Sequence, residues 1–457
     1  MSRLVNRSKP FTGWKKFLSF GPILLFLIYV IASQQGTGFS RETMFLSVFF
    51  GLVGLVITYF MLSGVYWKSF THLHPAKGRV LCIMPVYNEE SHLVHEAIKA
   101  LLRQTILPDV IHVVDDGSNP PLEVFNDPTG LVHFHRIKNS GKRHAQGHIL
   151  KMYAPGEFDF ILTVDSDSVL DDDAHERMLE SMSDDRVMAS TGMIFTRNWN
   201  TNLVTRLTDI NVTISCLLYR MARSWLGIVS PTSGALALYR SEIVYDNLED
   251  YLTSGTAGDD RRLSFYALMK GHVVGVAEAV VSTQLPTTFT GAFWQRMRWS
   301  KSAWLGTPFV WTNMSWLVIL NYTFPLTFAL MFPVGIGVLT AITFRYDSPV
   351  LVYGAIFWVV CSITQTMIYC LYRPSMSTKD KWIQFALSPF YPLFGLFILR
   401  PAAYWALTQL KSTSWHTRLS EVPVSEKESE LVLHSGSTEV SVDPDKWFWE
   451  ERSSKRL

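Results

Sequence analysis

Two long apolar segments towards the C-terminal end of the chain place the strongest limit on its fold. Residues 316–344 and 350–372 are each long enough to cross a lipid bilayer as a helix, and a short link joins them. Pro325 and Pro333 predict kinks in the first helix. A mean hydropathy of +0.15 over 457 residues agrees with a membrane protein that also has soluble parts.

Two further apolar runs, residues 17–33 and 43–67, lie near the N-terminus. Several Lys and Arg residues precede the first run, which favours a two-helix hairpin with a cytoplasmic N-terminus over a signal peptide. Lys68, Lys77 and Arg79 follow the second run. The segment after the hairpin is therefore predicted to be cytoplasmic as well.

A third apolar region, residues 382–410, contains Pro392 and the pair Arg400-Pro401, which predict interruptions. Basic residues on both sides indicate that both ends of this region are cytoplasmic, which requires an even number of crossings. A re-entrant or interfacial helix with a kinked hairpin satisfies this requirement. A single crossing would instead place residues 411–457 outside. The polar tail after residue 420 is predicted to be poorly ordered.

From about residue 78 to residue 284, short apolar strands alternate with helical or turn segments, as in an α/β domain. Predicted strands at residues 79–85, 110–114 and 158–164 each end in polar or acidic residues. Ligands of open α/β sheets lie outside the carboxyl ends of the strands, so we expect these ends to share one crevice. Residues 209–228 are apolar with two arginines and predict an interfacial helix lying on the membrane.

Charge and cysteine content narrow the class of protein further. The net charge is only +2, and the chain has no basic arm or dense Lys/Arg patch, so nucleic acid is not an expected partner. The four cysteines are scattered, without a CxxC pair. They are predicted to be reduced, buried thiols of a cytoplasmic protein.

Acidic and basic residues after the predicted strands suggest a phosphate site. Asp165 and Asp167 form a D-x-D motif, whose oxygen ligands would leave positions on a divalent metal open for phosphate and water. Isolated D-x-D motifs are more often turns or helix caps. Lys142 and Arg143 follow Gly141 and could neutralise phosphate. The chain has no G-x-x-x-x-G-K-[ST] loop, which argues against a nucleoside triphosphatase.

Two further acidic pairs have both a chemical and a structural interpretation. Asp115 and Asp116 could accept hydrogen bonds from a nucleobase or ribose, or could serve an ordinary turn with the following Gly and Ser. Asp259 and Asp260 precede two arginines. Adjacent carboxylates push their pKa values apart, so one could act as a base near neutral pH. A solvated charge cluster at a helix start is the alternative.

The stretch from Gln295 to Ser302, with the sequence QRMRWSKS, comes just before the long apolar segments. Its cations, polar side chains and single indole suit a site for an anionic leaving group and a flat, hydroxylated acceptor. A basic interfacial helix that directs its charges towards lipid headgroups is the alternative.

Taken in order, the motifs resemble those of the processive family 2 glycosyltransferases, and most closely those of the class I hyaluronan synthases. The resemblance covers roughly residues 10–420. Two departures, His416 where the family usually has Gly and an Ala-Leu-Ala sequence after Gly234, concern the sugar identity more than the reaction type. The matching motifs are Pro85-Val86-Tyr87-Asn88-Glu89, Asp115-Asp116-Gly117-Ser118, Gly141-Lys142-Arg143, Asp165-Ser166-Asp167, Ser233-Gly234, Gly258-Asp259-Asp260-Arg261, Gln295 to Ser302, Leu387 to Tyr391, and Trp415-His416-Thr417-Arg418.

The resemblance implies an α/β GT-A-type cytoplasmic glycosyltransferase domain inserted between transmembrane and interfacial helices. We expect an N-terminal segment and hairpin at residues 1–70, the GT-A domain at 71–290, the interfacial and transmembrane helices at 291–420, and a polar tail at 421–457. The implied enzyme is a multi-pass plasma-membrane hyaluronan synthase. It would polymerise UDP-GlcNAc and UDP-glucuronic acid and pass the growing polysaccharide through the lipid bilayer.

The same resemblance implies roles for individual residues. Asp260 would be the catalytic base, and Asp167 would hold Mn²⁺ or Mg²⁺. The donor would contact Val86, Asn88, Asp115, Lys142, Asp165, Arg298, Trp415 and Arg418. The acceptor would contact Ser233, Gly234, Asp259, Gln295 and Trp299.

Two kinds of alternative remain open. One is a synthase of another polymer, either a chitin-like chain of N-acetylglucosamine or a capsule containing glucuronate. The other is a non-catalytic membrane transporter or polysaccharide-binding subunit. Every candidate catalytic position holds the expected residue type, which argues against the second.

Overall fold

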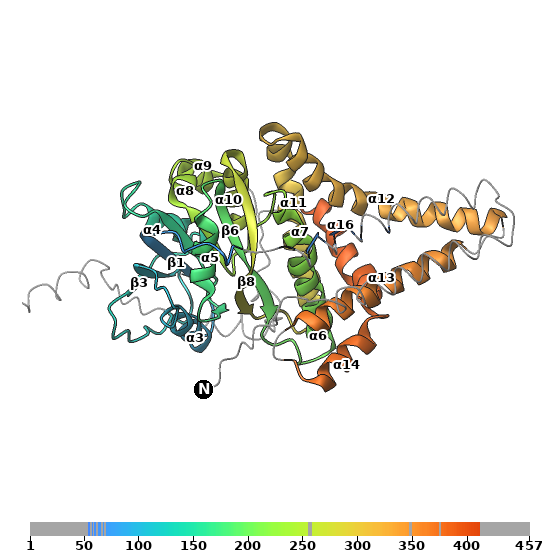
Figure 1. The fold of residues 1–457 in the computed structure, drawn as a ribbon, viewed down its shortest axis with the longest axis horizontal. Coiled ribbons are helices and arrows are strands. Elements are labelled where there is room, and N and C mark those ends of the chain that lie inside the picture. The colour runs from blue at the N-terminus through green and yellow to red at the C-terminus, as the bar shows by residue number, and fades with distance from the viewer. Residues whose placement is uncertain are drawn as a thin grey trace, which may run out of the picture. The chain divides into compact units, whose positions relative to one another are not determined.

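The computed structural model describes residues 70–254, 258–346, 350–373 and 376–411, with a few residues between 54 and 67 (Figure 1). Most of the predicted N-terminal hairpin lies outside the described residues, as do Trp415, Arg418 and the tail.

The centre of the fold is an eight-stranded mixed sheet with the strand order β3-β2-β1-β4-β7-β6-β8-β5 (Figure 1). The first four of these strands are parallel, and β7 is antiparallel to both of its neighbours. The parallel pairing brings the carboxyl ends of β1, β2 and β4 to one edge. The strands are β1 (Val80–Val86), β2 (Val110–Asp115), β3 (Val132–Arg136), β4 (Phe160–Thr163), β5 (Val169–Leu170), β6 (Val187–Thr196), β7 (Ala237–Arg240) and β8 (His272–Thr283).

Helices cover both faces of the sheet, which explains why β1 is apolar and buried along its whole length. Alternate β1 side chains pack into two separate cores. One core includes α3 (Ser91–Leu101) and α5 (Ala174–Met182). The other contains side chains of α4 (Lys142–Leu150), α8 (Ser241–Tyr245), α9 (Leu248–Thr253) and α10 (Asp259–Lys270).

The region predicted to be an interfacial helix is a helical run that begins before residue 209. It comprises α6 (Leu203–Ile214), a π-helical segment η1 (Ser215–Arg220) and α7 (Met221–Ser224). Asn202 starts the run with a capping box, in which its side chain accepts the N–H of Thr205. Many of its side chains are buried in the same core as α3 and α5. Contact of this run with a membrane stays a prediction.

The C-terminal part of the described chain consists of helices (Figure 1). By length and composition, α12 and α13 can each cross a membrane. The helix α14 and the helical run 391–408 form a bent pair, which would be a third membrane span if the pair crosses as one. These elements are α11 (Phe289–Asn313), α12 (Trp316–Tyr346), α13 (Val350–Tyr372), α14 (Thr378–Leu387), α15 (Tyr391–Phe394), η2 (Gly395–Leu399) and α16 (Arg400–Thr408).

The third apolar region bends at a different place from the one that Arg400-Pro401 predicted. The prediction of an interruption there is wrong, because the helical run continues through Pro401 into α16. The π-helical turn Gly395–Leu399 directly precedes α16. This turn widens the helix and gives room for the ring of Pro401. The bend of 59° lies instead between Leu387 and Tyr391, next to Pro392.

A buried ion pair joins the sheet domain to α13. Asp209 of α6 is fully buried, and its Oδ2 lies 3.2 Å from Nε of Arg373. The Tyr369 hydroxyl donates to the same carboxylate at 2.5 Å, and the backbone N–H of Thr196 donates to its Oδ1 at 3.0 Å. A buried charge without a partner costs several kcal/mol, so this network fixes the end of α13 against β6 and α6.

Candidate active site

The loops after β1 and β2 form one end of the crevice predicted from the strand ends. Val86 pairs in register with Asp115, and its carbonyl accepts the N–H of Asp116 at 2.8 Å. Asn88 has a positive φ of 49° and connects both loops: its N–H donates to Ser118 Oγ at 2.9 Å, and its Oδ1 accepts the N–H of Asn119 at 2.8 Å. Val86 itself is fully buried beneath this surface.

Asp115 and Asp116 both accept hydrogen bonds from backbone groups of loops, and contact of Asp115 with a nucleotide stays a prediction. Asp115 accepts the N–H of Ser118 at 2.8 Å, as an aspartate does in a turn. Asp116 accepts the N–H groups of Ser140 and Gly141, each at 2.8 Å. Burial raises the pKa of Asp116, while these two hydrogen bonds oppose the rise. Asp116 thereby fixes the loop that leads into α4 and Lys142.

The ammonium group of Lys142 is the centre of the site. Its Nζ lies 2.7 Å from Oδ1 of Asp165 and 2.9 Å from Oδ2 of Asp259, so it joins the D-x-D motif to the start of α10. Burial lowers the pKa of Lys142, but the two carboxylates outweigh burial and hold that pKa well above its usual value. Lys142 is therefore a permanent cation between two acidic motifs.

Gly234 lies directly against this ion pair. A Cβ at Gly234 would be 2.8 Å from Oδ2 of Asp165 and 2.9 Å from Nζ of Lys142. The preceding Ser233 holds the turn, because its N–H donates to Thr191 Oγ1 of β6 at 3.0 Å. Only a glycine allows the backbone to approach the Lys142–Asp165 pair this closely.

The two adjacent carboxylates at the start of α10 have opposite pKa shifts. For Asp259, the nearby Lys142 outweighs the desolvation that burial causes and lowers the pKa. For Asp260, desolvation and the charge of Asp259 raise the pKa to about 6. The structure thus supports the predicted separation of the pair: Asp260 has the pKa expected of a base that works near neutral pH.

The helix α11, which carries the QRMRWSKS stretch, contacts the residues on either side of the two carboxylates through Ser302. The Arg261 Nε donates to Ser302 Oγ at 2.9 Å, and Arg261 directly follows Asp260. Gly258, with a φ of +86°, packs so closely on Ser302 that a Cβ there would collide with Oγ. Of the residues predicted to bind sugar or diphosphate on α11, Gln295 is buried, Arg298 is half-buried and Trp299 is 42% exposed.

Asp167, the predicted metal ligand, is buried beside the same cluster, and its Oδ1 accepts the hydroxyl of Thr283 at 3.0 Å. Across the described ranges, no group of three or more His, Cys, Asp or Glu side chains is arranged to hold an ion. The carboxylate oxygens of Asp165 and Asp167 fit a hard divalent cation only if diphosphate oxygens complete its coordination. This arrangement suits an ion that binds together with a nucleotide.

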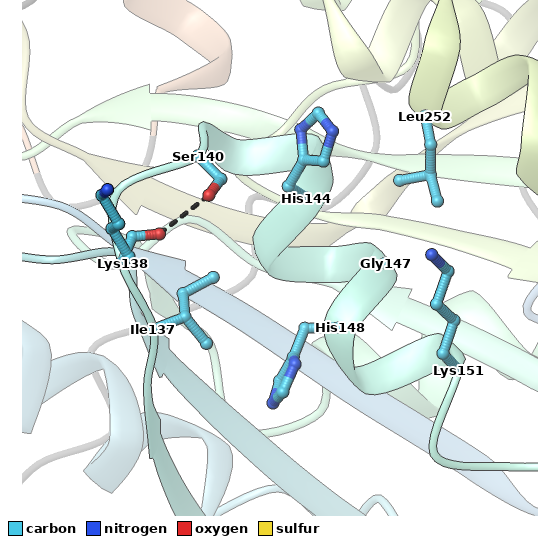
Figure 2. A pocket seen from close by; sticks show the side chains of 8 residues that line it. All are labelled: Ile137, Lys138, Ser140, His144, Gly147, His148, Lys151 and Leu252. Carbon is cyan, nitrogen blue, oxygen red and sulfur yellow. Dashed lines mark hydrogen bonds between the residues drawn. The ribbon is translucent and has the colours of Figure 1, made fainter. Parts of the chain in front are cut away.

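A cavity of about 290 Å³ lies along a different face of α4 (Figure 2). His144, His148 and Lys151 line it from that face, and Leu252 lines it from α9. Ser140, whose N–H bonds Asp116, is at its edge, but none of the predicted donor, acceptor or catalytic residues lines it. The site around Lys142 is therefore separate from this cavity.

Comparison with known proteins identifies the family. Residues 81–248 match the model of glycosyl transferase family 2. The hyaluronan synthase of Streptococcus pyogenes serotype M1 is 32% identical over 397 residues, which cover 80% of this chain and 90% of that protein. The chain belongs to the hyaluronan synthase-like glycosyltransferases of family 2. Its mixed α/β sheet is of the GT-A type, as predicted, and the apolar helices after the catalytic domain make this transferase a membrane protein.

Two other matches are more distant. An N-acetylglucosaminyltransferase of Mesorhizobium japonicum is 25% identical and covers 81% of this chain and 91% of that protein. A solved structure of a mannosyltransferase from Pyrobaculum calidifontis, in complex with GDP-Man and Mn²⁺, covers 78% of this chain and 97% of its own, with 15% identity and a TM-score of 0.45.

We expect Gly234→Ala to reduce UDP binding and transfer by about tenfold or more, the effect of losing one charge-assisted hydrogen bond. The added methyl group would force Lys142 away from Asp165. Calorimetric UDP binding and UDP release by the purified variant measure this effect. Gly335→Ala is the matched control, because a Cβ there meets nothing within 4 Å. Equal activity of both variants would show that the glycine at position 234 is not needed to keep Lys142 paired with Asp165.

Proposed function

We propose that this transferase is a processive, inverting hyaluronan synthase that uses UDP-GlcNAc and UDP-glucuronic acid. The observation that carries the proposal is the carboxylate of Asp260, with its pKa raised to about 6, next to the Lys142 cation that joins Asp165 and Asp259. A base and a cation for diphosphate in one site are what single-displacement sugar transfer needs. The similarity to a streptococcal hyaluronan synthase supports the choice of sugars.

In the proposed reaction, Asp260 takes the proton of an acceptor hydroxyl. The hydroxyl oxygen then forms a bond to the anomeric carbon of the donor, from the side opposite the diphosphate. The bond between that carbon and the diphosphate oxygen breaks, and UDP leaves with the electron pair. Inversion at the anomeric carbon follows from this single displacement.

The donor side of the site would neutralise the departing diphosphate. Lys142 is placed for this role, and the family resemblance adds Arg298 and Arg418. Val86, Asn88 and Asp115 would be close to the uridine. Asp167, with Asp165 beside it, would hold Mn²⁺ or Mg²⁺, whose positive charge stabilises the leaving group when it is bound.

The acceptor side would be formed by the start of α10, the turn before β7 and α11. The exposed face of Trp299 suits stacking under a pyranose ring, with Gln295 one helical turn before it. Asp259, Ser233 and Gly234 would border the acceptor, and Trp415 would lie on the donor side. The polymer would leave through the membrane helices, with the catalytic domain in the cytoplasm and the protein in the plasma membrane.

A second candidate is a synthase that makes chains of N-acetylglucosamine alone. The similarity to a rhizobial N-acetylglucosaminyltransferase, at 25% identity, favours it. The chemistry at Asp260 would be the same, and only the donors would differ.

The test is polymer synthesis by the purified protein in detergent, with each UDP-sugar alone and with both together. We expect polymer that hyaluronidase degrades only when both donors are present. Asp260→Asn is the matched control, because it removes the base and keeps the shape of the side chain; we expect it to bind UDP and make no polymer. Polymer from one donor alone would overturn the hyaluronan assignment, and more than about a tenth of wild-type synthesis by Asp260→Asn would move the base elsewhere.

The pH dependence of transfer follows from the raised pKa of Asp260. The base must be ionised, so kcat/KM, which reports the free enzyme, should fall as the pH drops through about 6, with roughly a tenth of the plateau left at pH 5. Initial rates of UDP release between pH 5 and 8, at donor concentrations well below KM, measure this limb. A flat profile down to pH 5 would contradict the assignment, since a carboxylate with an ordinary pKa would remain ionised there.

A further inference from the structure

Arg143, the residue after Lys142, donates hydrogen bonds to the chain shortly before Asp259. Its Nη1 donates to the carbonyl of Ser254 at 2.6 Å and to the hydroxyl of Ser254 at 2.7 Å. Its Nη2 donates to the carbonyl of Gly258 at 3.1 Å. One guanidinium therefore holds two points of the chain that come just before Asp259 and Asp260.

The surroundings of Arg143 keep this group in place. The guanidinium lies over the ring of Tyr251, 5.2 Å from its centroid, and donates to the Tyr251 carbonyl at 3.3 Å. Tyr251 is fully buried, and its hydroxyl bonds Gln146 on α4. The Arg143 side chain thus packs from the start of α4 against the end of α9.

Two adjacent residues of α4 consequently fix the start of α10 in two different ways. Lys142 binds the side chain of Asp259, whereas Arg143 binds the backbone at Gly258. On the other side, Gly258 packs against Ser302 of α11. A shift of Gly258 would move both carboxylates, since they are the next two residues.

We propose that Arg143 is a positioning residue, which sets the place of Asp260 relative to the donor by holding Ser254 and Gly258 together. This inference rests on the proposed role of Asp260 as the base. It gives Arg143 a different task from neutralising phosphate, which the sequence alone suggested for it together with Lys142. Its guanidinium is already engaged by carbonyl oxygens.

The role depends on the shape of arginine and not only on its charge. A guanidinium is a rigid fork that can donate to two carbonyls at once, whereas a lysine ammonium is a point charge on a flexible stem. A misplacement of about 1 Å in a catalytic group can cost roughly 100-fold in rate. Arg143→Lys keeps the charge and loses the fork, so it separates the two contributions.

The experiment compares wild type with Arg143→Lys and Arg143→Gln for kcat, for KM of each UDP-sugar and for UDP affinity by calorimetry. We expect both variants to lose roughly 10- to 100-fold in kcat, with KM and UDP affinity within about twofold of wild type. Lys151→Gln is the matched control. It also removes a cation next to α4, but from the cavity on the other face, and should leave all three quantities unchanged (Figure 2).

Ser254→Ala in the wild-type background provides a test that does not depend on the folding of the Arg143 variants, and its combination with Arg143→Lys provides a second test. It removes only the hydroxyl that bonds Arg143, so we expect a kcat loss of about two- to threefold in the wild-type background. The loss should vanish in the Arg143→Lys background, because coupled residues are not additive.

Three results would overturn the inference. They are restored kcat in Arg143→Lys, a loss that appears in KM and UDP affinity instead of kcat, and additive effects of Ser254→Ala and Arg143→Lys. The failure of the proposed function has a different signature: wild type would then make polymer from one donor alone, or Asp260→Asn would keep more than about a tenth of wild-type synthesis.

Discussion

The contact on which the site depends is the ammonium group of Lys142 between Asp165 and Asp259. Without this cation, the carboxylates of two motifs would face one another in a partly buried space, and each would resist ionisation. With it, Asp259 stays charged, and its charge helps to raise the pKa of its neighbour Asp260. The same ion pair lies against Gly234, where a side chain would require Asp165 or Lys142 to shift. The Lys142 side chain therefore links three features of the site: the charge of Asp165 and Asp259, the pKa of Asp260, and the close approach of the backbone at Gly234.

The parts of the site that follow from local sequence could be predicted. Buried apolar strands that end in Val86, Asp115 and the D-x-D motif had to meet at one sheet edge once they were parallel. A separation of the pKa values of Asp259 and Asp260 also follows from adjacency, because like charges on neighbouring residues cannot ionise equally well. Lys142, which is distant in the sequence, decides that the pKa of Asp259 is the lower one.

Partners that are distant in the sequence could not be predicted in this way. Nothing in the sequence around Lys142 specifies that Asp259 will be its partner. The sequence around Arg143 likewise does not show whether its guanidinium binds phosphate or carbonyl oxygens. Asp116 lies in a sequence typical of turns, but its carboxylate accepts the N–H of Ser140 and so holds a loop that is distant in the sequence. In each case the tertiary fold, and not the local pattern, decides which acceptor a charged group meets.

For the apolar helices, too, local features could be predicted from the sequence and long-range contacts could not. Length and apolar composition identified α12 and α13, because a bilayer sets a minimum span. Of the two interruptions predicted from proline, the one at Pro392 lies next to the bend, whereas the π-helical turn before Pro401 accommodates the ring of the second proline. The link between this part and the sheet is a buried ion pair, Asp209 with Arg373, whose partners are far apart in the chain. Such a pair becomes recognisable only when α6 and α13 lie together.

The most direct test of this account is an experimental structure of the protein with UDP and Mn²⁺. We expect the diphosphate and the ion to lie between Lys142, Asp165 and Asp167, with the carboxylate of Asp260 facing the side from which an acceptor would enter. Nucleotide bound instead in the cavity lined by His144, His148 and Lys151, with Lys142 still paired to both carboxylates, would contradict it.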